Sequence, residues 1–347
     1  MKLEELDKNF EVETSIGKDD IRFFDIEQKP FKIYGVFKEN GRYLRMPEEV
    51  AKTVSEKVYH LNEQTVGGRV RFVTDSSYIA IKVRQSKINI GARTTLISTM
   101  GFDLYVGNEF VKPFIPPMDS KDGFESIIEF STNEKREITI HFPRASSVED
   151  VYIGVQKDAV IEEPTPYKNT KPIVYYGSSI THGACASRTG MIYQNIISRR
   201  FNYDYINLGF SGNARGEQEI SDYIKNLDMS LFVLDYDHNA PTPQHLRETH
   251  ERFYRNVREK NPELPIILMS RPKFELNEGE TERLEIIKTT FKNAVDSGDK
   301  NIYLLDNKDL TSICKNDGTV DGCHPTDFGF VSMAKALGDL IEKLDLV

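Results

Sequence analysis

The sequence predicts a two-domain protein, with an antiparallel β-sandwich in residues 1–165 followed by a doubly wound, mostly parallel α/β domain in residues 166–347. The main observation is a change near residue 165 in how apolar residues recur along the chain. Before it they alternate strictly with polar residues, and after it they form unbroken runs. A polar segment with two prolines, residues 158–171, separates the two patterns, as a surface connection between domains would. The length of 347 residues also exceeds the size at which one hydrophobic core usually stops growing.

The first half shows the period of two that is typical of strands with one buried face. Three runs place their apolar side chains on one side, namely Ile79, Ile81 and Val83, then Ile138, Ile140 and Phe142, then Ile153 and Val155. Turn-rich loops separate these runs, which favours antiparallel pairing. One short helix is expected around residues 47–58.

The second half contains compact apolar runs without alternation, each followed by a segment of helical spacing. These runs cover residues 171–177, 203–210, 229–236, 264–270 and 301–306. Continuous apolar strands separated by helices indicate a parallel sheet that is covered on both faces. Ligands bind such sheets outside the carboxyl ends of the strands, so those ends are where a site is expected.

Composition excludes several classes of partner. The net charge is −9 and no basic cluster occurs, so nucleic acid is not an expected partner. The acidic amino terminus lacks the apolar stretch of a secretory signal and no later segment has about 20 apolar residues, which predicts a cytoplasmic protein without a membrane partner. Cys185, Cys314 and Cys323 lack metal-ligand spacing and are expected to be reduced.

The segment YYGSSITHG ends the first parallel strand with Ser178 and Ser179. A serine becomes a nucleophile only when a base takes its proton, and the base usually needs an orienting carboxylate. His324 lies just before the last helix with Asp321 three residues upstream, a spacing that lets the carboxylate accept from one ring nitrogen while the other faces the serine. The two next strands end near Gly212 and Asn239, which offer a backbone N–H and a side-chain amide to a developing oxyanion.

Together, GSSIT, the SGN of residues 211–213, the Asn239 corner and DGCHP resemble the four blocks of the SGNH hydrolases, also called GDSL-type esterases. The resemblance implies a three-layer, flavodoxin-like catalytic domain with Ser179 as nucleophile, His324 as general base and Asp321 as its orienter. It implies Ser179 N–H, Gly212 N–H and the Asn239 side chain as oxyanion donors. GFDLY, residues 101–105, resembles the GxDLY signature of a β-rich, jelly-roll-like domain that precedes some SGNH domains.

Other polar groups near these corners have two interpretations. His182 and Arg271 are candidates for substrate contact, and the alternatives are a loop histidine with local hydrogen bonds and a solvated or salt-bridged arginine. Ser178 is interpreted as a turn cap. The cluster of Asp235, Asp237 and His238 offers too few ligands on one face to hold a metal, so no metal or cofactor is expected.

The resemblance therefore implies a serine esterase that removes small acyl groups, acetyl first, from a small-molecule or oligosaccharide ester. Three alternatives stay open, namely an acyltransferase, a lipase-like esterase of the same fold, and a glycan-binding protein with a decayed hydrolase half. The sequence leaves the oligomeric state open.

Overall fold

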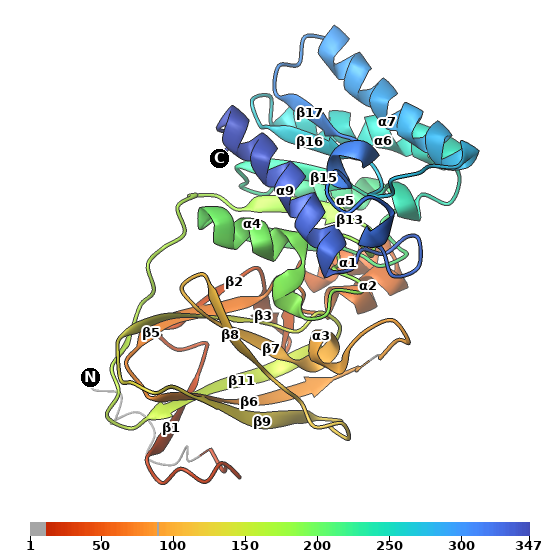
Figure 1. Ribbon diagram of the computed structural model, residues 1–347. Coiled ribbons are helices and arrows are strands. Elements are labelled where there is room, and N and C mark those ends of the chain that lie inside the picture. Colours follow the sequence, from red (N-terminus) through yellow and green to blue (C-terminus); the bar gives the residue numbers. More distant parts are fainter. Residues whose placement is uncertain (1–11, 89) are drawn as a thin grey trace.

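The computed structural model describes residues 12–88 and 90–347, and it shows a β-rich half next to an α/β half (Figure 1). The first eleven residues, on which the expectation of no secretory signal depends, lie outside the described residues. Among the helices of the described ranges, none combines the length and the apolar character that crossing a membrane requires.

The first half contains two antiparallel sheets. One has the strand order β1 (Ile21–Asp25), β11 (Ser147–Gln156), β6 (Tyr78–Ser86) and β9 (Gly123–Glu129). The other has the order β12 (Ile161–Glu162), β5 (Arg69–Thr74), β10 (Arg136–His141), β7 (Phe102–Val106) and β8 (Glu109–Phe114), with β2 (Lys32–Tyr34) also paired to β5. A small hairpin, β3 (Phe37–Glu39) and β4 (Arg42–Leu44), stands apart.

One hydrophobic core is shared by both sheets. All the alternating apolar residues that the sequence placed on one face belong to this core, and Ile79, Ile81, Ile138, Ile140 and Ile153 are fully buried in it. The prediction of antiparallel strands with one buried face is therefore confirmed. The jelly-roll-like order of connections stays a prediction.

The second half contains a parallel five-stranded sheet with the order β14-β13-β15-β16-β17. All five strands lie in the predicted apolar runs, as β13 (Ile173–Gly177), β14 (Tyr205–Gly209), β15 (Leu231–Asp235), β16 (Ile266–Met269) and β17 (Ile302–Leu305). In chain order this is 2-1-3-4-5, the doubly wound order of flavodoxin-like folds. The first strand lies between the second and the third, so the ends of these three strands meet at one place.

Helices cover both faces of this sheet (Figure 1). Successive residues of β13 point to opposite sides, with Val174 and Tyr176 in one core and Ile173 and Tyr175 in the other. The first core includes α5 (Gln218–Ile224), α6 (Pro243–Lys260) and α7 (Glu278–Asp296), and the second includes α4 (Tyr193–Phe201), α8 (Asn307–Leu310) and α9 (Asp327–Leu344). The prediction of a doubly covered parallel sheet is confirmed.

The expected single helix at 47–58 is instead two helices, α1 (Glu48–Val54) and α2 (Glu56–Asn62). Ser55 separates them in an extended conformation, and its side chain accepts a hydrogen bond from the backbone of Val58 to cap α2. Ala51 and Val58 are buried in the same core as α5 and α6. This early segment of the chain therefore packs against the α/β half.

Strand β7 carries the GFDLY segment and contacts the α/β half through polar groups. The buried carboxylate of Asp103 accepts hydrogen bonds from the backbone of Gly190 at 2.6 Å and from Arg188 at 3.0 Å. The Tyr105 hydroxyl accepts from the same guanidinium at 2.6 Å. The acid and the tyrosine of this motif therefore join the two halves. We propose the boundary between the domains near residue 165, between β12 and β13.

Candidate active site

The turn after β13 presents two serines at the carboxyl end of the sheet. Gly177 is needed there because a Cβ would lie 2.0 Å from the Thr181 hydroxyl and 2.2 Å from the Asp235 carbonyl oxygen. Ser178 is fully buried, and its hydroxyl accepts from the backbone of Ile180 at 3.2 Å, which is the capping contact that the sequence suggested. Ser179 is only partly buried, so its hydroxyl is the one available to a reactant.

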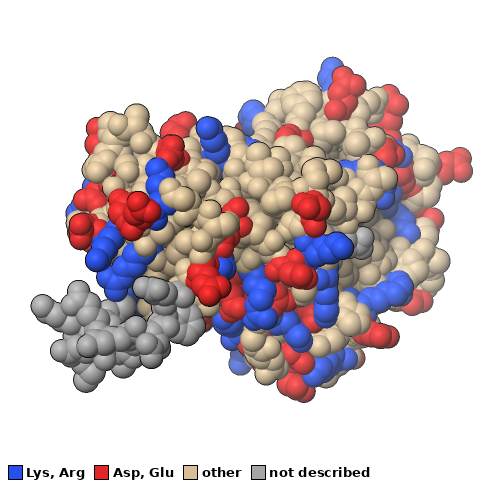
Figure 2. All heavy atoms as spheres, turned by 90° about the horizontal axis from the view of Figure 1, so that it is seen from below, with Lys and Arg blue, Asp and Glu red and all other residues tan. Residues whose placement is uncertain are grey.

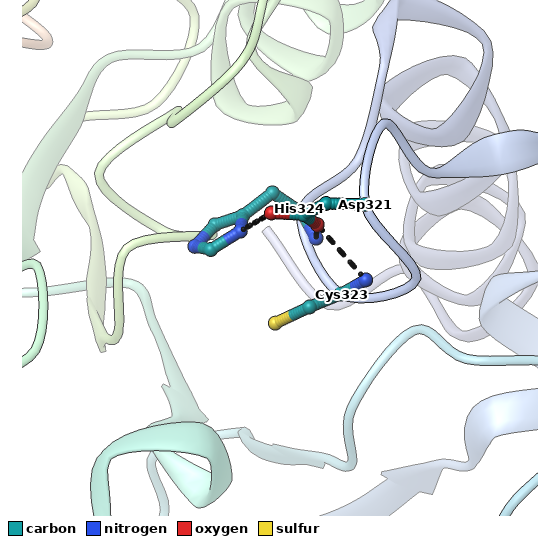
Figure 3. A group of neighbouring side chains, drawn as sticks. All are labelled: Asp321, Cys323 and His324. Atoms are coloured by element: carbon teal, nitrogen blue, oxygen red, sulfur yellow. Dashed lines mark hydrogen bonds and ion pairs between the residues drawn. The ribbon is translucent and has the colours of Figure 1, made fainter. Parts of the chain in front are cut away.

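His324 and Asp321 reach Ser179 from the loop before α9. The Ser179 hydroxyl lies 3.0 Å from Nε2 of His324, and Nδ1 of the same ring lies 2.9 Å from Oδ2 of Asp321. Figure 3 shows the Asp321 carboxylate beside the His324 ring. With Nδ1–H donating to the carboxylate, Nε2 is left as the acceptor for the serine proton. The structure thus brings together the three predicted residues in the order that nucleophilic catalysis requires.

The Asp321 carboxylate is held by several donors. Partial burial opposes ionisation, but hydrogen bonds from the backbone and ring of His324 and from Arg93 hold the pKa of Asp321 well below its usual range. Its Oδ1 accepts from the backbone of His324 at 2.8 Å and of Cys323 at 3.1 Å. The carboxylate is therefore charged at neutral pH and fixed in orientation.

Arg93 was not predicted as a site residue. It follows β6 in the sandwich half, and its Nη1 donates to Asp321 Oδ2, the same oxygen that faces the His324 ring. The two residues lie 228 positions apart in the sequence, and no motif surrounds Arg93. Only the packing of the sandwich against the loop before α9 could reveal this contact.

The expected oxyanion donors lie at the ends of the neighbouring strands. Gly212 has a φ of +73° and space around its Cα, and within the described residues neither its N–H nor that of Ser179 donates to a protein acceptor. Asn239 lies in the 3-10 helix η3 (Asp237–Asn239), where its Oδ1 accepts from the backbone of Ala214 at 3.3 Å. That contact orients the side chain so that its amide N–H₂ remains free to donate.

Arg271 lies under the η3 segment instead of at the surface. It is 8% exposed and makes a two-pronged ion pair with Asp237, at 2.9 and 3.0 Å, together with a bond to Glu280 at 3.0 Å. Arg283 adds bonds of 2.9 Å to the carbonyl oxygens of Asp237 and Ala240. These contacts favour the salt-bridged interpretation of Arg271, which positions the Asn239 corner.

His182 is fully buried and both of its ring nitrogens have partners. Nδ1 accepts from the Ser211 hydroxyl at 2.9 Å and Nε2 lies 3.3 Å from the carbonyl oxygen of Arg144. Burial, with the charges of Arg45 and Arg144, holds the pKa of His182 well below its usual range, so the ring is neutral. These contacts favour the interpretation of local hydrogen bonding, and the ring supports the loop that carries Gly212.

Cys323 lies beside the triad, and its Sγ is 3.5 Å from Nδ1 of His238. Asp321, Cys323 and His324 place one ligand atom each within 4.8 Å of one another, the one such metal-capable group found among residues 12–88 and 90–347. A metal shared with Asp321 would bind Nδ1 of His324, the nitrogen beside that carboxylate, and would replace the Asp321–His324 hydrogen bond. The donor set thus fits proton transfer better than metal binding.

Asp235 lies directly beneath the serine turn. Its carboxyl is 1% exposed and accepts from the Thr181 hydroxyl at 2.9 Å. Burial raises the pKa of Asp235 to about 8, with a smaller contribution from the charge of Asp237. This carboxyl is therefore protonated at neutral pH and acts as a buried hydrogen-bonding support for the turn.

Comparison with known proteins agrees with this geometry. Residues 170–342 match the GDSL-like lipase/acylhydrolase family, and residues 21–161 match the GxDLY domain, described as the N-terminus of SGNH hydrolase-type esterases. The chain belongs to the GDSL-type, or SGNH, hydrolase family, in the group that carries this N-terminal domain. No curated protein matched the chain.

Solved structures extend the likeness over both halves. A protein described as a GDSL-like lipase from Bacteroides ovatus is 29% identical, covers 94% of this chain and 99% of its own, and superposes with a TM-score of 0.83. The salicylyl-acyltransferase SsfX3 of a tetracycline biosynthetic pathway is 17% identical, with coverage of 95% and 99% and a TM-score of 0.78. A family two carbohydrate esterase from Cellvibrio japonicus is 11% identical, with coverage of 94% and 98% and a TM-score of 0.65. The last two show a shared fold.

Proposed function

We propose that this protein is a serine esterase that hydrolyses short acyl esters of carbohydrates, with acetyl as the expected acyl group. The observation that carries the proposal is the hydrogen-bonded order of Ser179, His324 and Asp321, with distances of 3.0 and 2.9 Å. The acyl and carbohydrate parts rest on the fold shared with a family two carbohydrate esterase and are proposed as the substrate class.

In the first half of the reaction, the Ser179 oxygen attacks the ester carbonyl carbon while Nε2 of His324 takes the serine proton. The carbonyl oxygen becomes negative and accepts hydrogen bonds from the N–H groups of Ser179 and Gly212 and from the Asn239 amide. The protonated ring then gives its proton to the leaving sugar oxygen as the ester bond breaks. Ser179 is left acylated.

In the second half, water takes the place of the sugar. His324 accepts a proton from the water, the resulting hydroxide adds to the acyl carbon, and the ring returns the proton to the Ser179 oxygen as the acid leaves. Asp321 keeps the ring in one tautomer and stabilises its charged form throughout.

The test is a panel of acetylated sugars, short aryl esters and long-chain esters, assayed on the wild type, Ser179→Ala and Ser178→Ala. Ser179→Ala should lower turnover by about 10⁴- to 10⁶-fold. The neighbouring variant is a matched control, because Ser178 only caps the turn and its loss should leave turnover within about tenfold. Equal activity of wild type and Ser179→Ala would refute the mechanism, whereas a preference for long-chain esters would refute the substrate class.

An acyltransferase would use the same acyl-serine and deliver it to an alcohol. Product analysis with and without sugar or aryl alcohol acceptors separates the two reactions, since hydrolysis yields free acid in both conditions. Labelling of Ser179 by a fluorophosphonate distinguishes either enzyme from a binding protein, because only an activated serine reacts.

A further inference from the structure

A cavity of about 280 Å³ lies between the sandwich half and the α/β half. It is lined from the sandwich by β5, β7 and β10, from the α/β half by the end of α4, and from the connection by Thr165 and Tyr167. Figure 1 shows α4 on the side of the α/β half that faces the sandwich. Helix α4 begins near the carboxyl ends of the parallel strands and runs back toward their amino ends. Its last turn therefore lies at the end of the sheet that is away from Ser179.

The floor of this cavity is cationic. Arg71 is 5% exposed and His141 is 2% exposed, and the guanidinium of Arg199 lies 4.4 Å from the centre of the Tyr105 ring. Glu137, Thr139 and His141 all line the cavity, since alternate residues of β10 point to the same face. The rim is formed by exposed residues, among them Asn108 and Thr165, so a solute can enter.

Several buried polar atoms in the floor have no partner in the described chain. They are Nε and Nη1 of Arg71, Nη1 of Arg199, and both ring nitrogens of His141, of which one carries a proton in the neutral ring. A buried charged donor without a partner destabilises the folded state, so a ligand or water must satisfy these groups. Donors from two guanidiniums and an imidazole that line one cavity are suited to an oxyanion.

The balance of charges around the cavity also favours an anionic ligand. Arg69 pairs with Asp204, Arg71 with Glu137 and Arg188 with Asp103. Arg199 has no carboxylate within ion-pair distance in the described residues, and its Nη2 donates only to the Gly190 carbonyl oxygen at 2.8 Å. Burial and the four arginine charges hold the pKa of His141 well below its usual range, as a positive potential requires. One positive charge is left uncompensated.

We propose that this cavity binds a small oxyanion, a phosphate, sulfate or carboxylate group, held by Arg71, Arg199 and His141. The volume of about 280 Å³ holds such a group with several waters, at about 30 Å³ per water. A bound anion contacts both halves at once and therefore stabilises their association. This site is separate from the triad and does not depend on the proposed esterase activity.

The test measures the melting temperature and the calorimetric heat of binding of the full chain with phosphate, sulfate, acetate or chloride at constant ionic strength. At about ten times its dissociation constant, the bound oxyanion should raise Tm by about 2–4 °C. Phosphate and sulfate also stabilise proteins by exclusion from the surface, so the response is compared with variants that lose only the site.

Arg199→Met removes the uncompensated charge, and Thr139→Glu places a carboxylate among the cations. Both variants should lose the heat of binding and the oxyanion-specific rise in Tm. Thr139→Glu should also melt at or above the wild-type temperature without added anion, because its carboxylate takes the place of the ligand. The control is Arg255→Met, which removes an exposed guanidinium from α6 and should respond as the wild type does.

A heat of binding that saturates with one of the three oxyanions, and that Arg199→Met and Thr139→Glu abolish, supports the proposal. The anion whose heat of binding saturates shows whether the cavity takes a phosphate, a sulfate or a carboxylate group. Equal responses in wild type and both variants, or a wild-type response to chloride as large as that to the oxyanions, would overturn it and leave water as the partner of these donors.

Discussion

Substitution of Asn239 by alanine should impair catalysis with little loss of stability. The side-chain oxygen accepts from the backbone of Ala214 at 3.3 Å, but that same N–H also donates to the Phe210 carbonyl oxygen at 3.1 Å. Losing the asparagine therefore leaves no buried donor without a partner, and the free energy of unfolding should fall by no more than about 1 kcal/mol.

The expected kinetic effect is much larger. Loss of one oxyanion donor lowers turnover by about 10²- to 10³-fold, equivalent to about 2.7–4 kcal/mol in the barrier. Since the donor acts on charge that exists only in the transition state, kcat and kcat/KM should fall by the same factor.

The assay is steady-state hydrolysis of a short aryl acetate, paired with urea unfolding of the same preparations. Asn226→Ala is the control, because this exposed asparagine donates only to the Asp222 carbonyl oxygen far from the triad, and it should retain wild-type turnover. Turnover of Asn239→Ala within about fivefold of the wild type would refute the role of this amide. So would a loss of activity that merely follows a loss of stability.

Three further changes test the residues around the serine. Asp321→Asn should lower kcat by about 10³- to 10⁴-fold, because an amide cannot hold the ring of His324 in the same tautomer; a loss below tenfold would contradict this. Arg93→Met should lower kcat less than about tenfold, since Asp321 keeps its backbone donors at 2.8 and 3.1 Å, and a loss equal to that of Asp321→Asn would be inconsistent with it. Asp235→Asn tests stability against pH. The folded pKa of about 8 lies above the unfolded value of about 3.9, so the folded state binds the extra proton between these values and wild-type stability falls as pH rises. From pH 5 to pH 7 the wild type should lose about 2–3 kcal/mol relative to Asp235→Asn in urea unfolding, and parallel pH profiles would disprove the buried proton.

Figure 2 shows the distribution of charged side chains on one face of the protein. Lysine and arginine side chains alternate there with acidic ones, and no broad area of one sign is visible. That nucleic acid is not a partner stays a prediction from the net charge of −9.

The strands and the candidate triad residues could be predicted from the amino-acid sequence alone. Alternating runs such as Ile79 to Val83 and continuous runs such as Ile173 to Gly177 differ in period because one sheet face or both faces are buried, and burial is a local property of each run. Ser179, Asp321 and His324 could be chosen because the chemistry of a nucleophilic serine limits which residue types can accompany it.

Contacts between polar groups that lie far apart in the chain could be recognised only in the folded protein. The fold placed Arg93 on Asp321, placed His182 and Arg271 beneath the site, and left the donors of Arg71 and Arg199 facing one interdomain cavity. The physical reason is that hydrogen bonds and ion pairs act over a few ångströms, whereas the sequence pattern records only whether each segment has a buried side. How two separately patterned halves dock is set by their packed surfaces, and no period along the chain encodes it.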